Sequence, residues 1–188
     1  MKKATKFLII IMLIGTISLL IYRISNGIYY RLPTDLSLFI VLLIPIVLNK
    51  YISLSNIDKL VIYIFIFIAD FLGCVVNLFK YVSWFDTFTH FLSGIFFFCV
   101  GLRMLYLFKA YNKNIYLNII FALGIVFASA CIWEIFEFFM DSVFNMNLQH
   151  YKDTGVLDTM EDIIACSIGG FLASIIYSKK FNDKLKKI

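Results

Sequence analysis

Charged residues are scarce in this chain of 188 residues, at 15% of the sequence, whereas hydrophobic residues make up 62%. A soluble domain of this length would carry more charge. Apolar stretches near 20 residues recur along the whole chain, which is typical of membrane spans. Little length is left between them for a separate soluble domain. We therefore expect an all-α, polytopic membrane helix bundle that forms one transmembrane domain over residues 1–188.

Several common site patterns are also missing. The four cysteines lie in four different apolar segments and form no CxxC pair, so we interpret them as buried small hydrophobes. The chain has no Walker loop, no GxSxG and no HExxH motif. Its net charge of +5 comes from cations that are segregated along the chain, which indicates membrane topology rather than nucleic-acid binding.

The continuous apolar runs predict six spans, and their lack of alternation disfavours a β-barrel. The first run resembles a secretory signal but lacks a convincing cleavage site before Arg23, so we expect a retained helix. The second run is short and contains Pro45. The expected spans cover about residues 5–22, 35–49, 57–79, 87–108, 115–140 and 160–178.

The distribution of lysine and arginine predicts the orientation. If the N-terminus is cytoplasmic, the outer segments hold only Arg23, Arg31, Lys80 and Lys152, and the other 13 cations fall on the cytoplasmic side. Cytoplasmic loops of membrane proteins carry this excess of positive charge. We therefore expect both termini in the cytoplasm of a multi-pass plasma-membrane protein.

Three pairs of ionisable residues lie three or four positions apart at the edges of apolar runs. Residues at this spacing share one face of a helix. Charge near hydrocarbon is costly, so ionisable residues there are functional-site candidates. Because the three helices reach the same depth, we expect one acidic pocket that faces the extracytoplasmic side. The pairs are Asp86 and His90, Glu134 and Glu137, and Asp158 and Asp162.

Each pair also has a simpler interpretation when it is taken alone. Asp86 could cap a helix while His90 lies at the membrane interface. The two glutamates could extend towards the membrane surface. Asp158 and Asp162 could stabilise a helix N-terminus through the helix dipole.

Asp70 is the deepest charge in the protein, about 13 residues into the third expected span and past the bilayer midplane. With α-helical spacing, Cys74 and Asn77 follow on its face. We expect Asp70 and Asn77 to line the same pocket, or Asp70 to form one step of a proton pathway. The alternative is a protonated aspartate that is hydrogen-bonded to another helix.

One imidazole among many carboxylates favours a hard or borderline divalent ion such as Mg²⁺, Mn²⁺, Fe²⁺ or Zn²⁺. His150 is a further candidate ligand and lies in the connection between the fifth and sixth expected spans. If the site is catalytic, the expected group is Asp86, His90, Glu134 and Glu137, with Asp86 orienting His90. The expected metal ligands are His90, Glu134, Glu137, Asp158 and Asp162.

The order of these motifs resembles that of the YjdF-like family of bacterial inner-membrane proteins. The resemblance covers about residues 84–177 and includes Gly169-Gly170 after the last motif. It implies a helical inner-membrane fold and the site positions, and it leaves the reaction open. The chain also shows a fainter likeness to VanZ-like membrane proteins, but it differs from their pattern by having a second glutamate. The matching segments are Asp86-xxx-His90, Glu134-xx-Glu137 and Asp158-Thr159-xx-Asp162.

Three functions remain open at this point. A metal-dependent site could bind or act on a lipid or cell-envelope amphiphile. A proton- or cation-coupled transporter could use Asp70 and the glutamates, although Pro45 and Gly73 are the only candidates for a broken helix. A non-catalytic membrane scaffold could bind ions only for stability. The lipid bilayer is the one partner that all three share, and none of them defines an oligomeric state.

Overall fold

The computed structural model describes residues 3–144, 147–149 and 151–185, and every regular element within these ranges is helical. The chain divides into two compact units, residues 1–85 and residues 86–188. The predicted all-α class is confirmed for the described residues. The prediction of one domain over the whole chain stays a prediction.

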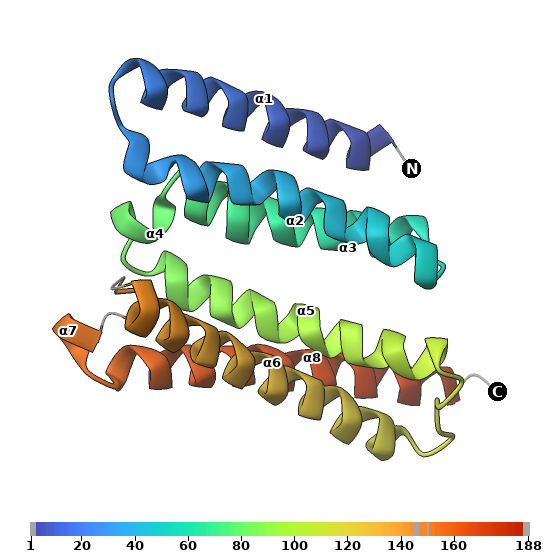
Figure 1. Ribbon diagram of the computed structural model, residues 1–188. Coiled ribbons are helices and arrows are strands. Elements are labelled where there is room, and N and C mark those ends of the chain that lie inside the picture. The colour runs from blue at the N-terminus through green and yellow to red at the C-terminus, as the bar shows by residue number, and fades with distance from the viewer. Residues whose placement is uncertain (1–2, 145–146, 150, 186–188) are drawn as a thin grey trace. The chain divides into compact units, whose positions relative to one another are not determined.

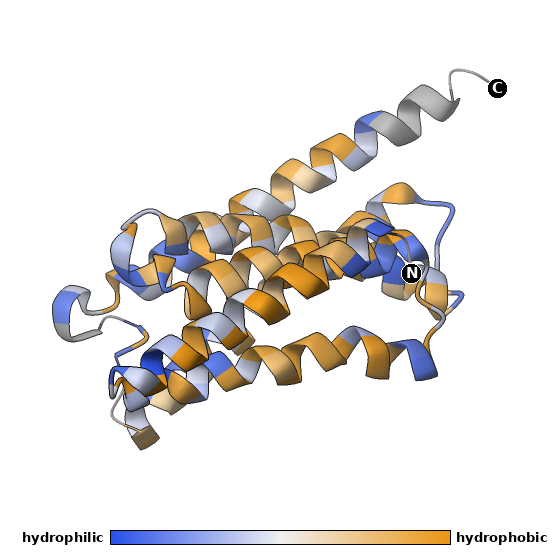
Figure 2. Cartoon of the chain, turned by 90° about the horizontal axis from the view of Figure 1, so that it is seen from above, coloured by the Kyte–Doolittle hydropathy of each residue, from blue (hydrophilic) through white to orange (hydrophobic). Residues whose placement is uncertain are grey.

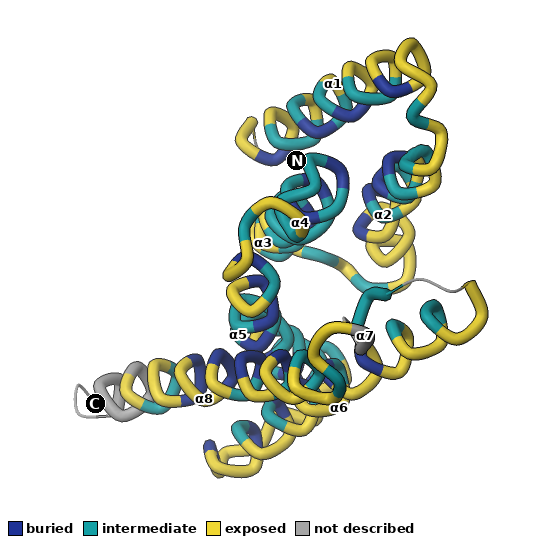
Figure 3. Tube along the Cα trace, turned by 90° about the vertical axis from the view of Figure 1, so that its left-hand side faces the viewer, coloured by how far each residue is buried: buried dark blue, intermediate teal, exposed yellow. Residues whose placement is uncertain are grey.

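The first unit consists of helices joined by short turns (Figure 1). Its core is apolar and comes from four segments, with Met12 from α1, Leu38 from α2, Tyr63 from α3 and Val75 from η2 all almost fully buried. The buried residues of α1 follow one side of the helix (Figure 3). The elements are α1 (Lys3–Ser25), the 3₁₀ turn η1 (Tyr29–Arg31), α2 (Leu32–Tyr51), α3 (Asn56–Ile66), η2 (Phe67–Val75) and α4 (Leu78–Tyr81).

The third expected span, 57–79, is not one α-helix. Helix α3 begins at a capping box in which Ser55 and Asp58 each accept a hydrogen bond from the other's backbone N–H. After Ile66 the chain continues as the π-helix η2, whose hydrogen bonds span five residues instead of four. The α-helical spacing that placed Asn77 on the face of Asp70 therefore does not hold. Asn77 lies beyond η2, with a left-handed backbone (φ 73°).

Two arginines bind the carbonyl end of η2. Arg23 forms a buried ion pair with Asp35 and donates from Nη2 to the carbonyl of Val75 at 2.7 Å. Arg31 donates to the carbonyl of Cys74. A helix end leaves carbonyl groups without partners, and arginine is well suited to satisfy them. The sequence places both arginines on the outer side and does not predict this packing role.

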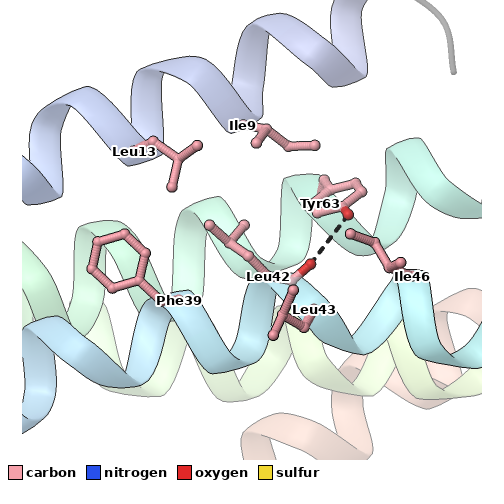
Figure 4. A pocket seen from close by; sticks show the side chains of 7 residues that line it. All are labelled: Ile9, Leu13, Phe39, Leu42, Leu43, Ile46 and Tyr63. Atoms are coloured by element: carbon pink, nitrogen blue, oxygen red, sulfur yellow. Dashed lines mark hydrogen bonds between the residues drawn. The ribbon is translucent and has the colours of Figure 1, made fainter.

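A hollow of about 340 Å³ lies between α1, α2 and α3 (Figure 4). Its lining is apolar apart from the hydroxyl of Tyr63, which donates to the carbonyl of Leu42 at 3.2 Å. Among the residues that the structure describes, no charged side chain lines this hollow. It belongs to the packing of the first unit.

The second unit consists of three long helices and one short one: α5 (Phe85–Leu107), α6 (Ile115–Phe144), α7 (Tyr151–Thr154) and α8 (Leu157–Leu185). Its core takes Phe98 from α5, Ala122 and Val126 from α6, and Cys166 and Ala173 from α8. Small residues dominate this core, so the helix backbones approach closely. All three predicted acidic pairs belong to these helices.

Five helical segments within the described residues are long and apolar enough to cross a membrane. Hydrophobic residues fill the middle of the helices, and hydrophilic residues gather near their ends (Figure 2). The segment 57–79 is absent from this set, and every 18-residue stretch of the adjoining helices α3 and η2 contains the three charged residues Asp58, Lys59 and Asp70. The number of six spans and the cytoplasmic termini stay predictions. The five segments are Lys3–Ser25, Tyr29–Tyr51, Phe85–Leu107, Ile115–Phe144 and Leu157–Lys179.

Candidate functional site

Helices α5 and α8 touch through their backbones. A Cβ atom added to Gly94 would lie 1.9 Å from the carbonyl oxygen of Cys166, and one added to Gly169 would lie 2.0 Å from the carbonyl oxygen of Phe91. Glycine at both positions therefore permits the contact. His90 lies one turn before Gly94, and Asp162 lies one turn before Cys166. The contact thus brings the imidazole and the carboxylate together.

We expect Gly94→Ala to destabilise the second unit, because the new methyl group would overlap a backbone carbonyl that cannot move aside as a side chain can. Overpacking of this kind costs about 1–3 kcal/mol. Gly124→Ala on α6 is the matched control, since a Cβ there meets nothing within 4 Å. Denaturation of both variants in detergent, followed by circular dichroism, measures the difference. Equal stability of the two variants would contradict the close contact.

Asp86, His90 and Asp162 form a compact triplet. The Nε2 atom of His90 lies 3.7 Å from Oδ1 of Asp86 and 3.6 Å from Oδ2 of Asp162. One ligand atom from each residue fits within 4.8 Å of the other two. His90 and Asp162 are buried, and Asp86 is partly buried. The distances from the imidazole exceed those of ordinary hydrogen bonds.

Glu134 and Glu137 on α6 have different surroundings. Glu137 accepts a hydrogen bond from the indole Nε1 of Trp133 at 2.8 Å and is partly exposed. Glu134 is only 6% exposed, and its Oε2 lies 3.4 Å from the amide nitrogen of Gln149. The other oxygen, Oε1, is buried without a hydrogen-bond partner among the described residues. Glu134 therefore retains one buried acceptor that can take a cation.

The acidic residues of the three helices lie close enough for their charges to interact. The carboxyl group of Asp162 interacts electrostatically with Asp86, Asp158, Glu134 and Glu137. Carboxylates crowded in a place of low dielectric repel one another unless protons or a cation offset the charge. Asp162 thus lies within electrostatic reach of the other four acids of the predicted pairs, and one site formed by all six residues stays a prediction. Their individual roles stay predictions.

Gln149 is a site residue that the sequence analysis missed. Its side-chain nitrogen lies 3.2 Å from the carbonyl oxygen of Glu134 and 3.2 Å from Oγ1 of Thr159, so it links α6 to α8. Asp141 holds the same segment by accepting hydrogen bonds from the backbone N–H groups of Leu148 and Gln149. A glutamine in a loop gives no sequence signal of such a role. The predicted ligand His150 lies outside the described residues.

Asp70 and Asn77 belong to the first unit, whereas the triplet belongs to the second. Asp70 lies within η2, and its Oδ2 atom is buried without a hydrogen-bond partner among the described residues. The expected contribution of Asp70 and Asn77 to the acidic pocket stays a prediction.

The membrane-length apolar helices define the class of the chain as a multi-pass membrane protein. Over residues 5–183 the chain matches the family described as predicted membrane protein (DUF2238), and it belongs to that family. This family is the YjdF-like family, so the resemblance drawn from the three motifs is confirmed. The likeness to VanZ-like proteins stays a prediction. No curated protein and no solved structure gave a significant match.

Proposed function

We propose that the second unit binds a divalent metal ion between Asp86, His90 and Asp162. The observation that carries the proposal is the triplet itself, because its three ligand atoms come from two helices and lie within 4.8 Å of one another. Atoms that bind one Zn²⁺ or Mn²⁺ ion at about 2.1 Å are roughly 3 to 4 Å apart. The distances of 3.6 and 3.7 Å from Nε2 of His90 agree with that range.

The donor set restricts the ion. One imidazole with carboxylate oxygens suits Mg²⁺, Mn²⁺, Fe²⁺ or Zn²⁺ and disfavours ions that require thiolates. In this arrangement Asp86 is a ligand rather than the residue that orients His90, since its carboxylate lies near the same nitrogen as that of Asp162. Glu134, Glu137 and Asp158 supply further negative charge or ligands. The buried Oε1 of Glu134 supports this assignment.

We further propose that the bound ion binds or activates a phosphate-bearing lipid or cell-envelope amphiphile on the extracytoplasmic side of the inner membrane. Carboxylates alone would repel a phosphate group, so this substrate class requires the cation. A bound divalent ion supplies a Lewis acid that polarises a phosphoryl oxygen. Glu134 and Glu137 are then the candidate general bases, because both carboxylates lie within electrostatic reach of Asp162.

The proposal predicts that metal ions stabilise the protein. After treatment with EDTA, addition of Mn²⁺, Mg²⁺ or Zn²⁺ should raise the unfolding temperature, by an amount that corresponds to about 2.7 kcal/mol when the ion is at 100 times its Kd. The effect should grow from acidic to neutral pH, because protons compete with the ion for carboxylate and imidazole atoms. Thermal unfolding in detergent at several pH values measures it. If no ion changes the unfolding temperature at any pH, the metal proposal fails.

A proton- or cation-coupled transporter is the second candidate, and a separate observation favours it. Asp70 lies in a nine-residue π-helix, and its Oδ2 atom is buried without a hydrogen-bond partner among the described residues. π-Helical segments occur frequently at functional sites, and an intramembrane aspartate is a common element of proton relays. If the protein is such a transporter, Asp70→Asn should abolish uptake of the transported species into vesicles when a pH gradient drives it. The metal-site proposal instead expects Asp70→Asn to leave metal binding unchanged.

A further inference from the structure

The end of the second unit that lies opposite the acidic cluster has an excess of positive charge among the described residues, where Asp183 near the end of α8 is the nearby acid. Residues 87–133 and 163–179 contain no aspartate or glutamate. Arg103, Lys109 and Lys113 lie at or near the α5–α6 connection, and Lys179 lies near the end of α8. The hydroxyl groups of Tyr111 and Tyr177 contact each other and tie this connection to α8.

A hollow of about 450 Å³ opens at this connection. It is lined by Tyr106, Leu107, Lys109 and Tyr111. The guanidinium of Arg103 lies over the ring of Tyr106, 5.2 Å from its centroid. The lining thus combines one cation and two tyrosine rings with an apolar wall, and a second cation lies over one of the rings.

The connection that forms the hollow is held in one conformation. The buried side chain of Asn118 accepts a hydrogen bond from the backbone N–H of Asn112 at 2.9 Å and donates to its carbonyl at 2.7 Å. Lys109 has a left-handed backbone (φ 54°) where α5 ends, and the N–H of Ala110 bonds back to the carbonyl of Leu105. A preformed loop loses little conformational entropy when a ligand binds.

We propose that this hollow binds the phosphate group of an anionic phospholipid. Charge complementarity carries the proposal, because at this end of the helices Arg103, Lys109, Lys113 and Lys179 outnumber the one nearby acid of the described residues, Asp183. Basic pockets between the ends of membrane helices are suited to anionic lipid headgroups, and tyrosine side chains lie at the level of those headgroups. The apolar wall of Leu107 and the tyrosine rings gives the acyl part of the lipid a surface that a free phosphate ion would not use. This site is independent of the metal proposal, whose residues lie at the other end of these helices.

Native mass spectrometry of the purified full chain tests the proposal. The protein in detergent is titrated with phosphatidylglycerol and with phosphatidylethanolamine of the same acyl chains. We expect preferential retention of phosphatidylglycerol. Lys109→Gln should weaken that binding about fivefold, since one lysine near an anionic headgroup contributes about that factor. Lys109→Arg, which keeps the charge, should bind as the parent does.

Lys50→Gln is the matched control, because Lys50 is an exposed lysine in the last turn of α2 and its loss changes the net charge equally. Equal retention of the two lipids by the parent would overturn the proposal, as would equal weakening by Lys50→Gln and Lys109→Gln. Displacement of phosphatidylglycerol by inorganic phosphate would show that the hollow binds a free anion and would also overturn it. If Lys109→Gln fails to fold, the lipid comparison on the parent and the Lys109→Arg variant still decide.

Discussion

Asp162→Asn is expected to abolish metal-dependent stabilisation of the protein. The substitution keeps the shape of a side chain that is only 3% exposed, removes its negative charge and replaces a strong ligand with a weak one. Loss of a residue that hydrogen-bonds to a metal ligand already lowers metal affinity about 10- to 100-fold. Loss of the ligand itself should therefore lower it roughly 100-fold or more. Unfolding temperature against metal concentration, recorded in detergent, measures the affinity.

Measurements in EDTA separate this effect from misfolding. Without metal, Asp162 lies among the charges of Asp86, Asp158, Glu134 and Glu137, so removal of its charge should leave the protein equally stable or more stable. Glu161→Gln is the matched control, because Glu161 is the exposed neighbour of Asp162 on the same helix and loses the same charge. An Asp162→Asn variant that responds to metal as Glu161→Gln does would remove Asp162 from the site.

Asp35→Ala is expected to destabilise the first unit by about 3–5 kcal/mol, which is the usual cost of removing one partner of a buried ion pair. Asp35 is fully buried, and Arg23 is 8% exposed. The substitution leaves the guanidinium with the hydrogen bond to the carbonyl of Val75 and without its carboxylate partner. Chemical denaturation in detergent, compared with the parent, measures the change.

The double variant Arg23→Met and Asp35→Leu provides the control. Apolar residues of similar volume can replace a buried ion pair with little loss of stability, so the double variant should recover most of the difference. A cost below about 1 kcal/mol for Asp35→Ala would be typical of an exposed pair and would contradict the burial of this one.

The positions of most helices were predictable from the sequence, because a long apolar run in a bilayer satisfies its backbone hydrogen bonds by forming a helix. The expected span 87–108 agrees with α5, and 115–140 agrees with α6, which continues to Phe144. The expected start of the last span, at residue 160, was three residues late because Asp158 and Asp162 lie inside the first turns of α8. Acidic residues lower the hydropathy at the start of a helix, so a hydropathy pattern places that start too late.

The π-helix was not predictable in the same way. An apolar segment such as Phe67–Val75 has the same composition whether its hydrogen bonds span four residues or five. The π-helical form is accompanied by tertiary contacts, because two arginines bind the carbonyls of Cys74 and Val75 at its end. Those arginines lie more than 40 residues away in sequence, so no local pattern reveals the contact.

The pairs of the candidate site were predictable because each depends on spacing within one helix. The contact between pairs depends on how α5 meets α8, and the glycines that permit it, Gly94 and Gly169, gave only a general signal of close packing. The sequence therefore indicated six candidate residues without showing which of them surround the imidazole. The structure brings Asp86 and Asp162 to His90.

Metal content per chain is the most direct test of the metal site. Parent, Asp162→Asn and Glu161→Gln proteins are incubated with Mn²⁺ or Zn²⁺ and desalted, and their metal is measured by inductively coupled plasma mass spectrometry. The triplet predicts a single bound ion per chain in the parent and in Glu161→Gln, and almost none in Asp162→Asn. Equal metal content in all three proteins, or none in the parent, would contradict a metal site at Asp86, His90 and Asp162.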